Sequence, residues 1–288
     1  MKLSPQLQTE MDSRNLKFIQ ACDMDGFVDA ADVVTVPSWP EFMHHDPVAN
    51  NWYSMHEKYP EFQFALIETE TEKWIAVGNS IPLHFDGALE DLPDAGWDWA
   101  MLTGINADKP ANLFSALAIQ ILPDYRGGGL STIMIKVMQE IGLSHGLTKL
   151  IAPVRPNKKS DYPLIPMETY IEWAKDDLPF DPWLRVHHRL GARILKVCPE
   201  AMCIPGTIKS WEEWTGLSFQ SSGDYIVPGA LSPVKIDFEN DRGVYIEANV
   251  WMLHDYDKKR TKAYLKEKLS HDKSRKPFKA VLHHSSRE

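Results

Sequence analysis

Residues 121–132 read ILPDYRGGGLST, with three consecutive glycines at 127–129. Residues 113–122, which lead into this stretch, are nearly all apolar, as expected for a strand that is covered on both faces. After it, apolar residues recur at helical spacing from Ile133 to Ile141, and Gly146 offers a stop. The sequence therefore predicts a buried strand, a turn of three glycines and a helix.

This glycine turn favours an anionic ligand. Glycines let the backbone approach a ligand closely, and the first amides of the following helix have no partner within the helix. The positive end of the helix dipole attracts phosphate, and Arg126 beside the turn adds further donors. We expect a diphosphate at this turn.

The residues around the turn exclude several diphosphate-binding and hydrolytic classes. A Walker A loop needs a lysine after its last glycine, but Leu130 and Ser131 follow Gly129. A dinucleotide-binding turn needs a third small residue where Thr132 stands and an acid where Arg155 stands. An NADP-binding oxidoreductase that uses Arg155 for the 2′-phosphate is therefore a weak alternative. Ser131 lacks the flanking glycines of a nucleophile elbow.

Further elements follow from periodicity. Residues 62–68 and 74–85 predict two successive strands joined by a short turn, and residues 149–154 predict the strand after the helix, parallel to the first. Alternating runs at 225–237 and 243–252 predict a late antiparallel hairpin.

Two helices are predicted outside this core. Residues 6–19 show a loose helical pattern, and a short helix is expected to begin at Ser210, which has capping-box spacing to Glu213, and to end at Gly216.

Residues 121–131 closely resemble the acetyl-CoA signature of the Gcn5-related N-acetyltransferases (GNAT superfamily), whose core is Arg/Gln-x-x-Gly-x-Gly/Ala. Arg126, Gly129 and Ser131 stand at its fixed positions, with Ser as a small substitute. Residues 187–192 match the later Tyr-x-x-x-Gly-Phe pattern in part. The resemblance implies an α/β fold: a mixed, mostly antiparallel central sheet with a β-α-β acyl-CoA-binding core and flanking helices.

The resemblance also implies the reaction. Acetyl-CoA would be the cosubstrate, and a small amine would attack its thioester directly, without a covalent enzyme intermediate. Amides of the glycine turn would hold the pyrophosphate, and the end of the central strand would pair with the pantetheine arm. The cofactor-binding residues so implied are Ile119, Gln120, Ile121, Arg126, Gly127, Gly128, Gly129, Leu130, Ser131, Thr132 and Asn157.

The sequence identifies the general acid and the general base of the reaction less clearly. His187 stands where the family has its tyrosine, and an imidazole has the unperturbed pKa nearest neutrality, so His187 or its neighbour His188 is the expected proton donor to the leaving thiolate. The central strand holds no carboxylate. His84, Asp86 and Glu68 at strand ends are therefore the candidates for the base.

We expect residues 1–254 to form one acyltransferase domain with an N-terminal helical extension and an insertion at about residues 156–183. The insertion is rich in proline and aromatic residues, and we expect it to cover the acceptor. Residues 255–288 form a basic tail of charge +6, whereas the rest of the chain carries −15. The acidic body argues against nonspecific nucleic-acid binding and favours a cationic substrate.

The sequence gives little support for a membrane protein, a disulfide-linked protein or a metalloenzyme. No apolar stretch is long enough for a bilayer span, and we expect a cytoplasmic protein, with a homodimer left open. Three cysteines fit neither a disulfide framework nor zinc, and His44-His45-Asp46 and His283-His284 lack further ligands, so no metal is expected. The alternative from another class is a noncatalytic module that binds an acyl-CoA or an acyl carrier.

Overall fold

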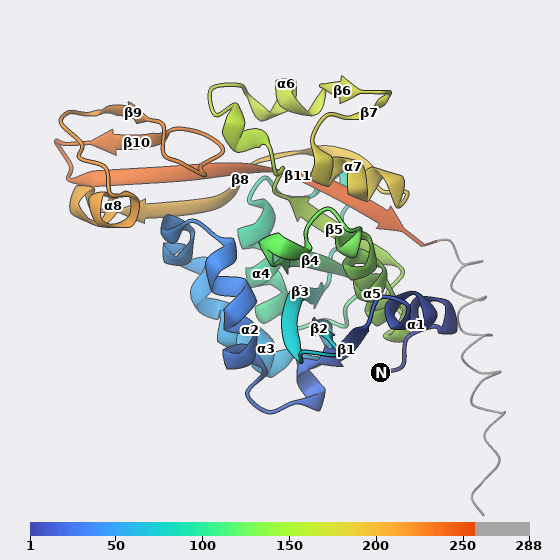
Figure 1. Cartoon of the computed structure of the whole chain (residues 1–288). Coiled ribbons are helices and arrows are strands. Elements are labelled where there is room, and N and C mark those ends of the chain that lie inside the picture. Colours follow the sequence, from blue (N-terminus) through green and yellow to red (C-terminus); the bar gives the residue numbers. More distant parts are fainter. Residues whose placement is uncertain (257–288) are drawn as a thin grey trace, which may run out of the picture.

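The computed structural model describes residues 1–256, so the predicted basic tail lies almost wholly outside the described residues. Its main sheet has nine strands in the order β1-β2-β3-β4-β5-β11-β10-β9, with β8 paired to β11 (Figure 1). The strands are β1 Leu16–Gln20, β2 Gln63–Glu68, β3 Lys73–Leu83, β4 Leu113–Ile121, β5 Lys149–Val154, β8 Arg193–Gly206, β9 Gly223–Tyr225, β10 Val234–Asp237 and β11 Arg242–Asp255.

Only β4 and β5 are parallel within this sheet; its other neighbouring strands run antiparallel. The predicted mixed, mostly antiparallel α/β fold is therefore confirmed. A separate two-stranded hairpin pairs β6 Ala174–Lys175 with β7 Leu178–Pro179. The α-helices are α1 Pro5–Asp12, α2 Phe27–Thr35, α3 Trp52–Lys58, α4 Gly96–Ile105, α5 Leu130–Ser144, α6 Met167–Ile171, α7 Pro182–Arg189 and α8 Ile208–Thr215.

Successive residues of β2 and β3 point to opposite faces of the sheet, so both faces carry apolar side chains. Helices cover each of these faces. Ala76 and Leu66 lie in one core cluster with α1 and α5. Val77 and Ala65 lie in another, under α2. The buried stripe of α5 that the sequence predicted, including Ile133 and Ile141, is fully enclosed.

The N-terminal prediction was wrong in part. Helix α1 ends at Asp12, and Leu16–Gln20, of which residues 16–19 were expected to be helical, form β1. Asn15 takes a left-handed conformation with φ of 55°, which ends the helical course, and the next five residues pair with β2 at the sheet edge. Pairing along an open edge thus outweighs a weak helical pattern.

The C-terminal hairpin is confirmed as β10 and β11, although β10 begins only at Val234. Helix α8 ends at Gly216 as predicted, but it begins after Thr207, whose side chain accepts from the amide of Ser210. Ser210 is therefore the third helical residue and not the cap.

One irregularity of the sheet positions the site. The parallel strands β4 and β5 pair only at Phe114–Leu150 and Ser115–Ile151. Beyond this point β4 runs on to Ile121 and β5 to Val154 without pairing to each other, and a register shift in the β3–β4 pairing leaves an extra residue at Leu117. The carboxyl ends of the two central strands therefore splay apart.

Candidate active site

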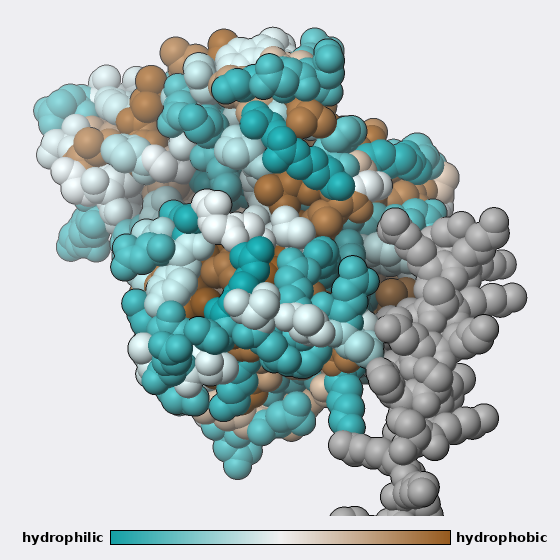
Figure 2. All heavy atoms as spheres, turned by 45° about the vertical axis from the view of Figure 1, so that its right-hand side comes forward, coloured by the Kyte–Doolittle hydropathy of each residue, from teal (hydrophilic) through white to brown (hydrophobic). Residues whose placement is uncertain are grey.

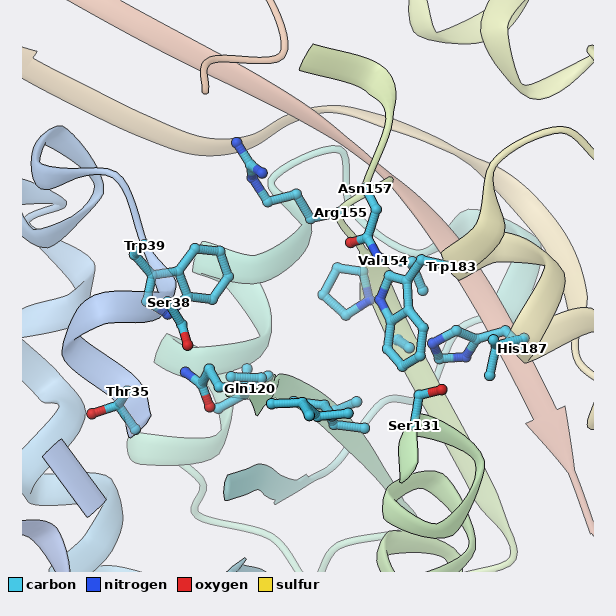
Figure 3. A pocket seen from close by; sticks show the side chains of 18 of the residues that line it. Thr35, Ser38, Trp39, Gln120, Ser131, Val154, Arg155, Asn157, Trp183 and His187 are labelled. Atoms are coloured by element: carbon cyan, nitrogen blue, oxygen red, sulfur yellow. The ribbon is translucent and has the colours of Figure 1, made fainter. Parts of the chain in front are cut away.

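A cavity of about 980 Å³ occupies this splay (Figure 3). Residues 116–121 of β4 and 152–154 of β5 line its middle. The glycine turn and α7 line one end, which we call the cofactor end, and α2 with the residues after it line the other, which we call the acceptor end. On the outside, Figure 2 shows apolar side chains gathered near the middle of one face, between polar surfaces above and below.

The glycine turn at the cofactor end is open to a ligand. Gly127 and Gly129 have left-handed φ angles of 81° and 82°, and a Cβ on Gly127 would meet nothing within 4 Å. Within the described residues no hydrogen bond engages the amides of residues 127–131, whereas the amide of Thr132, which we expected to be free, bonds to the carbonyl of Gly129. Because α5 starts here, free amides and the helix dipole together suit a diphosphate.

Two arginines shape this turn. Arg126 donates from Nε to the carbonyl of Ile121 at 2.9 Å, which ties the two sides of the turn together. Arg14 donates from Nη1 to the carbonyl of Gly128 at 2.6 Å. No local sequence pattern marks Arg14, because it lies 114 positions from Gly128 and reaches it only in the folded chain.

The middle of the cavity runs along the free edge of β4. The indole of Trp97 donates to the carbonyl of Leu117 at 2.9 Å and so fixes the irregular residue. Gln120 is 4% exposed, and its Oε1 receives no hydrogen bond from the described residues, although its side chain lines the cavity (Figure 3). Ile119 and Ile121 line it as well. An extended ligand has unpaired strand backbone beside it along this edge.

His187 also lines the cavity, but it is buried and neutral. Asp181 caps α7 by accepting from the amides of Trp183 and Leu184, which orients the helix. Nδ1 of His187 lies 2.9 Å from Nε2 of His254, and its own Nε2 is enclosed without a hydrogen bond, next to the ring of Trp183. Burial, and then the neighbouring His254, hold the pKa of His187 well below its usual value. An imidazolium acid at neutral pH is therefore not available from His187.

The other expected acid and base residues do not meet at the cavity. His188 is exposed and points elsewhere on α7. His84 and Asp86 bond to each other at 2.6 Å just beyond Leu83, which pairs with Leu113 at the start of β4, the end remote from the glycine turn. Glu68, outside the cavity lining, accepts from the hydroxyl of Tyr125 at 3.3 Å.

The insertion does not form the expected cover. Its aromatic side chains pack on one another, and the hydroxyl of Tyr170 donates to Asp181 at 2.9 Å. Only its boundaries reach the cavity, at Asn157 and Trp183, so the insertion braces α7 instead of closing over the acceptor. The packed rings are Tyr162, Tyr170, Trp173 and Phe180.

The acceptor end carries one buried ion pair among aromatic rings. Arg155 donates from Nε to both carboxylate oxygens of Glu247, at 3.0 and 2.9 Å, and from Nη2 to the carbonyl of Gly229 at 2.6 Å. Glu247 is fully buried and also accepts from Tyr245 at 2.7 Å and from Asn249 at 2.9 Å. Arg155 was expected to bind only the 2′-phosphate of NADP, and its pairing with Glu247 removes support from that alternative. The aromatic rings here are those of Trp39, Trp52 and Trp97.

Two further acids lie near this ion pair. Asp46 Oδ2 and Asp98 Oδ1 are buried and have no hydrogen-bond partner among the described residues. The two carboxyl groups lie close enough to influence each other's pKa. Burial and the neighbouring acid both favour the neutral, protonated form of a carboxyl group. Burial raises the pKa of Asp98 to about 8 and that of Asp46 to about 6; the charge of Asp46 raises the former further.

Neither metal nor membrane features are found in residues 1–256. No group of three His, Cys, Asp or Glu side chains there could hold a metal ion. No helix in the same range is long and apolar enough to cross a membrane. Its three cysteines, Cys22, Cys198 and Cys203, are unpaired.

Comparison with known proteins agrees with this geometry. No family model matches the chain. It is 31% identical over 247 residues to an arginine N-acetyltransferase of Aspergillus versicolor, an alignment that covers 75% of this chain and 84% of that protein.

Solved structures share the fold. The loading GNAT-like domain of CurA from Lyngbya majuscula has a TM-score of 0.54 at 21% identity, covering 84% of this chain and 96% of that one. The GNAT-like decarboxylase GphF, in complex with isobutyryl-CoA, has a TM-score of 0.52 at 14% identity, covering 83% and 98%. This chain is therefore an acyl-CoA-dependent N-acetyltransferase with acetyl-CoA as cosubstrate, and it belongs to the GNAT superfamily.

Proposed function

We propose that this protein transfers the acetyl group of acetyl-CoA to an amine nitrogen of arginine or of a closely related guanidino amino acid. The observation that carries the proposal is the relative at 31% identity, whose acceptor is arginine by its name. The acceptor end of the cavity has the chemistry that such a molecule needs.

That chemistry consists of flat aromatic walls and a few charges. Indole faces attract a guanidinium by stacking and by cation–π attraction, which is worth about 0.5–2 kcal/mol. Trp39 and Trp52 supply such faces beyond the splay, and Arg155 with Glu247 places both signs of charge beside them. An amino acid that carries a carboxylate, an ammonium and a guanidinium is complementary to this mixture.

Acetyl-CoA would lie with its diphosphate on the glycine turn and its pantetheine along the free edge of β4. The cofactor-binding role of residues 119–121, 126–132 and Asn157 is part of this proposal. It is supported by the free amides of residues 127–131 and by the position of these residues, all except Gly128, on the cavity wall. The thioester would then face the acceptor end through the splay.

The transfer needs no covalent intermediate. The neutral amine nitrogen attacks the thioester carbonyl carbon, the tetrahedral intermediate collapses, and the carbon–sulfur bond breaks. The nitrogen loses one proton and the thiolate of CoA gains one, so the products are the N-acetylated acceptor and free CoA. Because His187 is neutral, we propose that it helps to shape the cavity and does not deliver this proton as an imidazolium.

Thiol release provides the test. The purified protein is given acetyl-CoA with arginine, lysine, ornithine or spermidine, and kcat/KM is measured for each. We expect arginine to exceed lysine by about tenfold or more, because loss of the matched guanidinium contacts costs about 1.5–3 kcal/mol. A Gly129→Trp variant, whose glycine turn is blocked, should release no thiol. Turnover of other amines without turnover of arginine would refute the proposed acceptor.

A further inference from the structure

We infer that Arg155 is the residue that binds the acceptor's carboxylate, so that the enzyme selects α-amino acids over the corresponding simple amines. This inference rests on the proposed function, since it concerns how the same site reads a guanidino acceptor.

The guanidinium of Arg155 is held from one edge and open on the other. A guanidinium has five N–H groups in a fixed fork. Glu247 takes the Nε edge, and the carbonyl of Gly229 takes one bond from Nη2. Nη1 takes part in neither of these contacts, the hydroxyl of Tyr245 also lies beside the guanidinium, and the side chain, 20% exposed, lines the cavity (Figure 3). The outer Nη1 and Nη2 edge therefore faces no protein carboxylate and keeps N–H groups that can donate to a ligand.

This open edge is rigidly oriented before any ligand arrives. Glu247, 0% exposed, is itself fixed by Tyr245 at 2.7 Å and Asn249 at 2.9 Å. The ring of Trp39 lies 6.0 Å from the guanidinium carbon and adds a cation–π contact. A guanidinium that is already fixed loses little entropy when it takes a bidentate carboxylate.

Charge and position favour a carboxylate that belongs to an amino acid. Arg155 and Glu247 together are neutral, and so is the ammonium–carboxylate pair of an α-amino acid, so their association leaves no unbalanced charge. Arg155 follows directly on Val154, the last residue of β5, whose edge borders the splay. A carboxylate on the free edge would hold the rest of the acceptor between the splay and the indole rings.

Arginine and agmatine test this inference, because agmatine is arginine without its carboxylate. We would measure kcat/KM for both acceptors with the wild-type protein and with Arg155→Gln. The wild type should prefer arginine by about 10- to 100-fold, the value of a charge-assisted bidentate contact. Arg155→Gln should lose most of this preference by lowering kcat/KM for arginine, while kcat/KM for agmatine changes by less than about threefold.

Two further variants guard against misfolding. Arg155→Gln leaves the buried Glu247 unpaired, which destabilises proteins strongly, so the double variant Arg155→Gln/Glu247→Gln removes both charges together. Glu247→Gln alone keeps the guanidinium and should keep the preference for arginine. Calorimetric titration with CoA shows for each variant that the cofactor end is intact.

The outcomes separate the two proposals. Equal turnover of arginine and agmatine by the wild type, or an equal loss of both in the folded variants, would overturn the role of Arg155 and leave the proposed function standing. No turnover of either compound by a protein that acetylates other amines would overturn the proposed function, and the inference with it.

Discussion

Arg14 donates from Nη1 to the carbonyl oxygen of Gly128 at 2.6 Å, across 114 positions of the sequence. Its guanidinium nitrogens lie 3.7 and 3.8 Å from the place that a Cβ on Gly129 would take. The turn between α1 and β1 thus brings a positive charge against the back of the glycine turn. This contact fixes the turn and raises the potential where the diphosphate would lie.

Replacing Arg14 by Ala should therefore weaken CoA binding. We expect Kd to rise about fivefold in low salt, which corresponds to the ~1 kcal/mol of one exposed charge contact, and by less in 0.5 M salt because of screening. Isothermal titration of CoA at two salt concentrations measures this. Lys17→Ala is the matched control, since Lys17 lies on β1 and pairs with Glu72 at 3.5 Å. Equal effects of both substitutions would contradict a specific contribution of Arg14.

Gly129 offers a second test of the cofactor end, with a control built into the chain. Gly129 and Gly146 have nearly the same left-handed φ, 82° and 77°, but Gly129 lines the cavity and Gly146 follows the far end of α5. Alanine at either position should cost about 1–2 kcal/mol of folding free energy. Only Gly129→Ala should also raise the Kd for CoA, by about tenfold, because Gly129 lines the cavity and its Cβ would lie against the Arg14 guanidinium that holds the glycine turn. A similar Kd for both variants would show that backbone strain alone matters.

The local part of this fold could be predicted from the sequence because it rests on short-range chemistry. The apolar run before Leu122, the three glycines and the stripe from Ile133 to Ile141 specify strand, turn and helix without help from the rest of the chain. The same locality explains the error at Leu16–Gln20, where pairing with β2 decides the structure.

Sequence patterns could predict only those parts of the candidate site whose residues are neighbours in the sequence. The residues of the glycine turn lie on the cavity wall, but Arg155 and Glu247 are 92 positions apart and meet only through the pairing of β5 with β11. The partial match to the family pattern pointed to His187, which lies at the cavity. Its enclosure by Trp183 and His254, however, depends on tertiary packing, and this enclosure keeps the imidazole neutral. A residue type at a family position therefore does not establish an acid.

The charge state of His187 leads to a prediction about pH dependence. Its pKa is held well below the ordinary value and that of His254 is lowered to about 4, in both cases first by burial. Neither imidazole should therefore titrate between pH 6 and 8. We expect that the pH profile of kcat, measured with saturating substrates, contains no inflection in this range that depends on His187. The His187→Gln variant should therefore have the same profile as the wild type, with kcat within about tenfold of the wild-type value.

His188→Gln is the control for that substitution, since His188 is exposed on the same helix. The decisive measurement is the pH profile of kcat for the wild type and both variants. An inflection between pH 6 and 7 that disappears only in His187→Gln would restore His187 as the proton donor.

The carboxyl pair of Asp46 and Asp98 makes the stability of the protein depend on pH. Burial raises the pKa of Asp98 to about 8, whereas an unfolded aspartate titrates near 3.8, so the folded protein binds the extra proton. The stabilisation from this proton is complete at low pH and is lost as pH rises through about 8. Asp98→Asn replaces the protonated carboxyl group by a neutral amide that does not titrate, while its carbonyl can still accept from the amide of Cys203.

We therefore expect the Tm of Asp98→Asn relative to the wild type to rise progressively between about pH 4 and pH 8, and to be highest at pH 8.5. The difference at pH 8.5 should be about 3–6 °C, since ~1–2 kcal/mol shifts Tm by this much in a protein of this size. Thermal unfolding followed by circular dichroism at four pH values measures it, with Asp91→Asn, an exposed carboxylate, as the control. A difference that does not grow with pH would show that neither Asp46 nor Asp98 holds a proton near neutrality. In that case both would be ionised, and the repulsion between them would have to be offset by groups other than the amides of Val48 and Cys203 that they now accept from.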